Sequence, residues 1–234
     1  MSNAIDLISA YNTIDAKLRS MYHGKGNLQF TDLVRRSAQF NKIVKKYEEE
    51  LLSLARLRNA IVHNSTKEIL IAEPCDEFTA LAVHIAELLS APPKLNLLKE
   101  QTVKGISEQE SVKEAICFAT RERYSNIPVY QGERFIGILN NRRLVRSLGK
   151  ALQDGTPLEQ FFALPCSAIL GDDDFPHYYQ LMSREDTVQD AIDAFERNRK
   201  LLAVVVTQHG KMGEPITNIF TATDLPRLIQ ILED

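Results

Sequence analysis

The chain of 234 residues is 44% hydrophobic and 25% charged, a composition that is ordinary for a globular protein with a packed core. Its formal net charge of -3 argues against a broadly basic surface that coats nucleic acid, although it permits local basic patches. No apolar run approaches the ~20 residues of a membrane span, and the N-terminus lacks a charged-then-apolar signal pattern.

Cysteine usage points to a reducing compartment. Cys75, Cys117 and Cys166 are odd in number, widely spaced and without a CxxC pair, which is typical of free thiols rather than of a disulfide framework or a zinc site. The histidines outside the motif described below have no second ligand at metal spacing. We therefore expect a soluble, cytoplasmic protein with no metal and no membrane contact.

Residues 1–91 have the pattern of an all-helical bundle. Apolar side chains recur near a 3.6-residue period, the signature of amphipathic helices, over residues 3–22, 31–40, 43–62 and 76–89. Thr31 has the residue type of an N-cap for the second helix, and Asn41 interrupts the pattern before the third. Pro92 and Pro93 cannot continue a helix, so we place a domain boundary at this point.

A repeat begins beyond residue 98. The sequence SVKEAI at residues 111–116 recurs as TVQDAI at residues 187–192, and each reads as an N-cap followed by a helix with the same apolar spacing. Two strand-like runs and a closing helix follow in each copy at matching distances. Helix, hairpin, helix, repeated twice, predicts an α/β tandem whose two small sheets pack together, because neither copy buries enough surface alone.

The predicted fold is thus a helical bundle followed by a tandem α/β module. The expected boundaries are residues 98–153 for the first repeat and residues 177–234 for the second. Residues 154–176 form a partly ordered connector between them, and its acidic run at residues 172–174 is expected to be a solvated loop.

The second repeat carries the most specific motif of this region. Thr221, Thr223 and Asp224 stand where a strand ends and a helix begins, and with the repeat they resemble a tandem pair of CBS domains, the Bateman module. The resemblance implies an adenine nucleotide, AMP, ATP or a related signal, as a regulatory ligand. A hydroxyl and a carboxylate could bond the two ribose hydroxyls, and the base would lie in an apolar slot near Val204.

The first repeat departs from this motif. Asn140 and Arg143 occupy the matching positions, and arginine cannot accept hydrogen bonds from ribose hydroxyls. Arg142 and Arg143 either receive phosphate groups of a ligand centred on the second half-site or form a solvated face. Residues 125–129 (SNIPV) nevertheless match the base-pocket strand of the family better than the second repeat does. We expect one competent site per chain, or a shared one.

Within the bundle, one helical stretch is mainly apolar but contains three polar residues, Arg58, Asn59 and His63. The spacing Arg-x4-His resembles the signature of HEPN domains, helical bundles that usually dimerise. In active members the pair cleaves RNA without metal. The resemblance implies His63 as general acid or base, Arg58 as the stabiliser of phosphate charge, and Asn59 as a positioning residue.

Helix geometry adds a constraint on this motif. Arg58 and His63 are five residues apart and diverge by roughly 140° around a helix with 3.6 residues per turn. A single regular helix therefore does not direct both side chains at one phosphate. For both to act on it, either the end of the helix frays or two chains contribute one residue each across a two-fold axis. A homodimer is the more economical expectation.

Two functions remain compatible with these motifs. In the first, the CBS pair binds a nucleotide and controls a dimeric HEPN domain that cleaves single-stranded RNA, with no role for DNA. In the alternative, the bundle only dimerises or recruits a partner and has no catalytic activity. A ligand can control the bundle in either case only if it prefers one arrangement of the protein over another.

Overall fold

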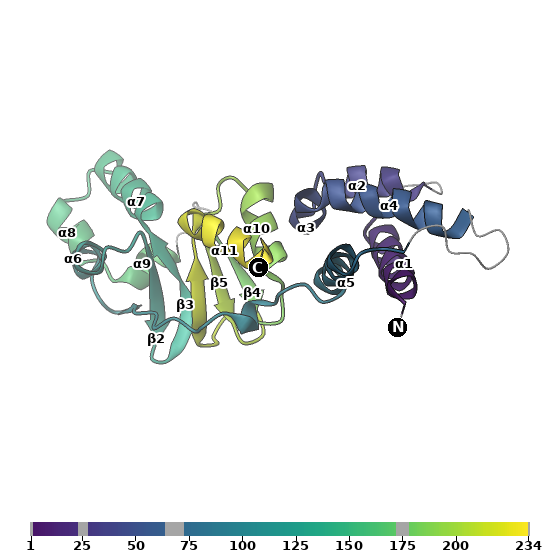
Figure 1. The fold of residues 1–234 in the computed structure, drawn as a ribbon. Coiled ribbons are helices and arrows are strands. Elements are labelled where there is room, and N and C mark those ends of the chain that lie inside the picture. Colours follow the sequence, from purple (N-terminus) through teal and green to yellow (C-terminus); the bar gives the residue numbers. More distant parts are fainter. Residues whose placement is uncertain (1, 23–27, 64–72, 172–177, 234) are drawn as a thin grey trace. The chain divides into compact units, whose positions relative to one another are not determined.

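The computed structural model (Figure 1) describes four stretches of the chain, residues 2–22, 28–63, 73–171 and 178–233. The packing divides the protein into two compact units, one of residues 1–93 with 227–234 and one of residues 94–226. None of the helices within the described stretches is long and apolar enough to cross a membrane.

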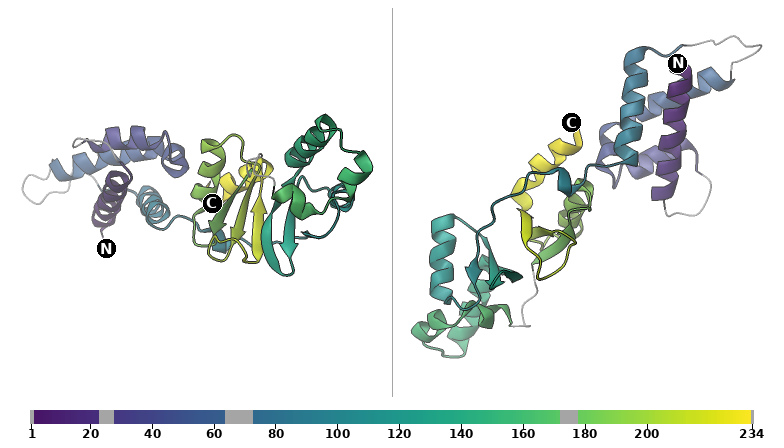
Figure 2. Two further views of the ribbon diagram at one scale, coloured as in Figure 1. Left: turned by 180° about the vertical axis from the view of Figure 1, so that it is seen from behind. Right: turned by 90° about the horizontal axis from the view of Figure 1, so that it is seen from below.

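Helices are the only regular secondary structure in the described residues of the first unit up to Ser90, as the periodicity predicts, but the helix expected over residues 43–62 is divided in two at Tyr47. They are α1 (Asn3–Met21), α2 (Phe30–Ser37), α3 (Lys42–Lys46), α4 (Glu48–His63) and α5 (Asp76–Ser90). On α1, Leu7, Ile14 and Leu18 are spaced by seven and four residues, so they lie on one face and are fully buried. Helices α1 and α5 pack side by side (Figure 2).

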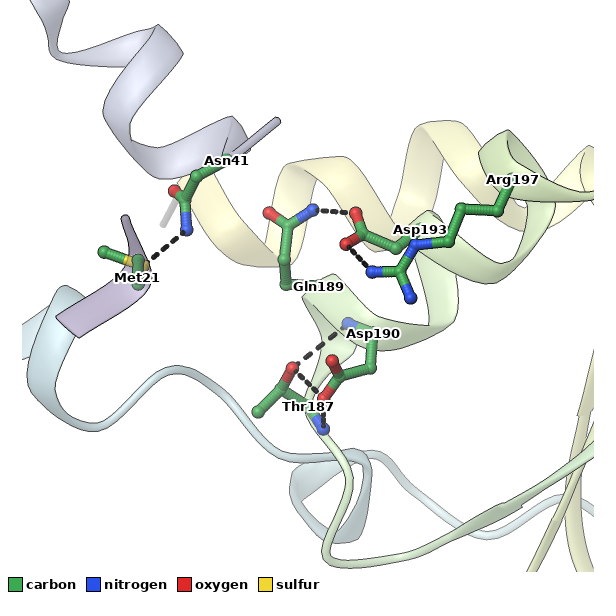
Figure 3. A network of polar contacts seen from close by, with 7 residues as sticks. All are labelled: Met21, Asn41, Thr187, Gln189, Asp190, Asp193 and Arg197. Atoms are coloured by element: carbon green, nitrogen blue, oxygen red, sulfur yellow. Dashed lines mark hydrogen bonds and ion pairs between the residues drawn. The ribbon is translucent and has the colours of Figure 1, made fainter. Parts of the chain in front are cut away.

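Two details of the bundle differ from the sequence prediction or refine it. Thr31 is not an N-cap, because α2 already begins at Phe30 and Thr31 lies inside its first turn. Asn41 does interrupt the helices: its side-chain oxygen accepts a hydrogen bond from the Val44 backbone N–H at 3.0 Å and caps α3. Its amide also donates to the Met21 sulfur at 3.7 Å (Figure 3).

The second unit contains two copies of one arrangement. The first copy is β1 (Ile106–Ser107), α6 (Val112–Glu122), β2 (Asn126–Gln131), β3 (Arg134–Asn140) and α7 (Asn141–Gln153). The second is β4 (Tyr179–Ser183), α10 (Val188–Arg197), β5 (Ala203–Thr207), β6 (Ile216–Phe220) and a short 3₁₀ turn, η2 (Ala222–Asp224). The helix that closes this copy, α11 (Leu225–Glu233), belongs from Arg227 onward to the first unit. In each sheet the leading strand runs parallel to the middle strand, which pairs antiparallel with the third.

The helices α6 and α10 both begin at the N-cap residues that the sequence repeat predicts, Ser111 and Thr187. Ser111 and Glu114 form a capping box at α6, and Thr187 and Asp190 form the matching one at α10 (Figure 3). In the second box the Asp190 carboxylate accepts hydrogen bonds from the Thr187 backbone at 3.0 Å and from the Thr187 hydroxyl at 2.6 Å. These local contacts explain why both helices start at the same point of the repeat.

The two sheets pack on each other through a shared core. Phe135 and Ile138 of β3 and Ala203 and Val205 of β5 are all buried in one hydrophobic cluster. Because two of these residues come from each repeat, the cluster joins the repeats directly. The prediction that the small sheets pack together is therefore confirmed.

The predicted connector is more ordered than expected. It contains α8 (Leu158–Ala163) and α9 (Cys166–Leu170), and Phe161 and Cys166 are buried in the core of the first repeat. Burial raises the pKa of the Cys166 thiol to about 12, whereas Cys75 and Cys117 are exposed. The acidic run 172–174 lies outside the described residues.

Candidate functional site

A cavity of about 380 Å³ lies in the second unit, where three separate segments meet. The segment before β1 contributes Gln101, Thr102 and Val103; the α6–β2 connection contributes Arg123, Tyr124, Ser125 and Asn126; and the end of the second repeat contributes Ile219, Thr221 and Thr223. Residues of the first repeat and of the closing motif of the second therefore line one cavity. Such a volume is near the lower end of the ~300–1,000 Å³ typical of small-molecule pockets.

The Thr221 motif supplies hydroxyl groups to this cavity. Thr221 follows β6 directly, and its hydroxyl lies 2.7 Å from the Thr223 hydroxyl. Asp224 holds this turn together, because its Oδ2 accepts hydrogen bonds from the Thr221 backbone N–H at 2.7 Å and the Thr221 hydroxyl at 3.0 Å. Asp224 itself does not line the cavity. The arrangement presents two hydroxyls backed by a carboxylate.

The segment that links α6 to β2 supplies a hydrogen-bond acceptor. Asn126 is the first residue of β2, and its side-chain oxygen is buried without a hydrogen-bond partner among the described residues. An amide acceptor in this state favours a ligand that donates a hydrogen bond. Ser125 lies beside it on the cavity wall. The SNIPV sequence at residues 125–129 predicts a base-pocket strand here, but it does not single out Asn126 as a ligand contact.

Arg143, predicted as a phosphate contact, is 1% exposed and lies in the interior of the first repeat. Its Nε donates to the Ile169 carbonyl at 2.7 Å and its Nη2 to the Leu170 carbonyl at 2.8 Å. The backbone N–H of Arg143 donates to the Asn140 side chain, which caps α7. The arginine that replaces the acidic residue of the motif thus neutralises the carbonyl end of α9.

The other two predicted residues also lie away from the cavity walls. Arg142 places its guanidinium 4.9 Å from the centre of the Tyr178 ring, which is a cation–π contact. Val204, the second residue of β5, is fully buried and is not among the residues that line the cavity. The structure brings Thr221 and Thr223 together, with Asp224 behind them, but not with Arg142, Arg143 or Val204.

In the bundle, Arg58 of α4 is held against α1. Its guanidinium lies 5.2 Å from the centre of the Tyr11 ring, and its Nη1 donates to the Asn59 side chain at 3.3 Å. The Arg58 Nε is buried and has no hydrogen-bond partner within the described residues. Burial raises the pKa of Tyr11, as does the nearby Asp15 carboxylate, while Arg58 opposes both effects.

His63 is the last residue of α4, but its side chain falls outside what the structure describes. The expectation that Arg58 and His63 act together, through a frayed helix end or across two chains, therefore stays a prediction. In the described part of the chain, no cluster of three or more His, Cys, Asp or Glu residues could hold a metal ion.

No protein-family model and no curated protein matches the chain. Among solved structures, the chain is similar to CBSX2 in complex with AMP, with 13% identity over 61% of this chain and 99% of that one and a TM-score of 0.46. It is also similar to a putative acetoin utilization protein, AcuB, from Vibrio cholerae, with 12% identity over 60% of this chain and 93% of that one and a TM-score of 0.46. The CBS domain of a bacterial CNNM/CorC family Mg²⁺ transporter in complex with ATP shows 17% identity over 62% of this chain and 92% of that one, with a TM-score of 0.42.

Proposed function

We propose that the second unit is a CBS-type sensor that binds an adenine nucleotide in the cavity beside Thr221. The observation that carries this proposal is the meeting of three segments distant in sequence, which brings Thr221, Thr223 and Asn126 to the walls of one cavity. Bound there, the nucleotide regulates the protein rather than reacting.

Each polar group has a role that fits a nucleoside. The ribose hydroxyls meet the hydroxyls of Thr221 and Thr223, which can both donate and accept hydrogen bonds, while the Asp224 carboxylate holds Thr221 in place from behind. The exocyclic amino group of adenine donates to the Asn126 oxygen, which has no partner of its own. Tyr124 adds an aromatic surface on the same wall.

The test is the affinity of purified protein for AMP and ATP, measured by isothermal titration calorimetry. Thr221→Val removes a hydroxyl and should weaken binding at least about tenfold, the equivalent of one good hydrogen bond. Thr156→Val is the matched control, because Thr156 lines no part of the cavity. The proposal fails if neither nucleotide binds, or if both variants bind as tightly as the unchanged protein.

We further propose, as a second candidate function, that paired bundles cleave single-stranded RNA. The feature in its favour is the Arg58 guanidinium, which Tyr11 and Asn59 position on α4 while its Nε has no partner among the described residues. A positioned cation of this kind can stabilise charge on a scissile phosphate. Without cleavage, the same bundle would serve dimerisation or partner recruitment alone.

The RNA proposal is tested by incubating single-stranded RNA with the protein in the presence of EDTA. Arg58→Ala should slow cleavage about 10²–10³-fold, whereas Arg56→Ala on the exposed side of the same helix should not. If two chains build each site, mixing Arg58→Ala with His63→Ala protein restores part of the activity. Absence of cleavage by the unchanged protein, or equal rates in both arginine variants, would leave only the non-catalytic role.

A further inference from the structure

A second cavity adjoins the first. It has a volume of about 370 Å³, and three of its lining residues, Arg123, Tyr124 and Ser125, also line the cavity beside Thr221. Its remaining walls come from α6 and the first turn of α7, namely Ile116, Ala119, Thr120, Asn141 and Leu144. The two cavities are similar in volume, about 380 and 370 Å³, so each has room for one nucleoside-sized group on its own side of residues 123–125.

Arg123 is the charged group that both cavities share. Among the described residues that line them it carries the only formal charge, and its guanidinium has no hydrogen-bond or ion-pair partner within the described chain. An unpartnered arginine in a polar pocket favours an anion, and its planar fork suits phosphate oxygens. One positive charge matches the single negative charge of a phosphodiester better than it matches a polyphosphate chain.

The backbone of Arg123 makes its presence costly. With φ at 57° it is the one non-glycine residue in the described chain with a positive φ, at the position after α6 where glycine is favoured. Residues held in this region carry strain of order ~1 kcal/mol or more. A non-glycine side chain at such a position is a candidate for a functional role.

The chemistry of the second cavity differs from that of a phosphate site. Beyond Arg123 its walls combine apolar groups (Ile116, Leu144) with neutral hydrogen-bonding groups (Thr120, Asn141), and no further cation is among them. Such walls suit a flat ring with polar edges rather than additional phosphates.

We propose that the ligand is a dinucleotide. Its first nucleoside lies beside Thr221, its bridging phosphate lies at Arg123, and its second base occupies the cavity between α6 and α7. This inference rests on the proposed nucleotide site and adds the class of ligand and the residue that reads its phosphate.

The test compares the affinities of adenosine, AMP, ATP, adenylyl-adenosine dinucleotide and cyclic di-AMP by isothermal titration calorimetry. At least one dinucleotide should bind tenfold or more tightly than AMP and ATP. Thr120→Trp, at an exposed position of α6, fills the second cavity and should abolish that advantage while AMP affinity stays unchanged. Arg123→Gly should weaken every phosphate-bearing ligand about tenfold but not adenosine, without lowering the melting temperature of the ligand-free protein.

Arg121→Ala is the matched control, because it removes a neighbouring surface charge that lines neither cavity. The inference is overturned if AMP or ATP binds as tightly as both dinucleotides, or if Thr120→Trp leaves dinucleotide affinity intact. In those cases the nucleotide site itself stands. If no adenine compound binds the unchanged protein, both the inference and the proposed function fail.

Discussion

Replacing Arg143 with alanine is expected to lower the free energy of unfolding by about 3–5 kcal/mol, measured by urea denaturation. The side chain is 1% exposed and donates to the carbonyls of Ile169 and Leu170 at 2.7 and 2.8 Å. Removing it leaves two acceptors at the end of α9 without donors and opens a cavity in the first repeat.

Two companion variants sharpen this experiment. Arg142→Ala removes the neighbouring arginine, whose guanidinium contacts the ring of Tyr178, and should cost about 0.5–1 kcal/mol. Arg143→Lys keeps the charge but loses the planar fork that reaches two carbonyls, so its stability should be intermediate. Equal losses for Arg142→Ala and Arg143→Ala would contradict a structural role for the buried guanidinium.

The second large effect is expected at Phe135. Its side chain is fully buried between the two sheets and makes edge-to-face contacts with Tyr130 and Tyr179, each at a ring separation of 6.1 Å. Phe135→Ala should cost about 3–5 kcal/mol, as is typical when a large buried ring is removed. Because the cluster joins the repeats, their unfolding should also become less cooperative.

Denaturation curves followed by far-ultraviolet circular dichroism and by tyrosine fluorescence test this expectation, since the two probes should no longer coincide in the variant. Val145→Ala is a control on the same repeat, where a side chain that is 68% exposed should change stability by less than about 0.5 kcal/mol. A Phe135→Ala protein with unchanged, coincident transitions would show that the sheets do not depend on this ring.

Local features of the sequence predicted much of this fold. The apolar period located the helices of the bundle, and the paired capping boxes at Ser111 and Thr187 located both copies of the repeat. The leading strands β1 and β4 were missed. They pair in parallel with strands that follow a whole helix later, and β1 spans only two residues, so no local pattern marks it.

The site was only partly predictable, for a related reason. Thr221 and Thr223 carry a motif that is legible in the sequence, and both line the cavity. Arg143 looked like a surface charge because its partners are backbone carbonyls of α9, which any residue type can supply. Val204 lies in a strand buried on both faces, where alternation gives no clue to the side that meets a ligand.

The contact between Thr221 and Asp224 affects both the affinity that is measured for a ligand and the way in which binding can be detected. The Asp224 carboxylate accepts two hydrogen bonds from Thr221, so a ligand that engages the Thr221 hydroxyl competes with one of the protein's own hydrogen bonds. The free energy of binding that is measured is therefore reduced by the cost of losing this capping contact, about 1 kcal/mol. The Thr221 amide proton becomes a built-in reporter: its chemical shift and exchange rate in NMR spectra follow occupancy directly, with no label attached to the ligand.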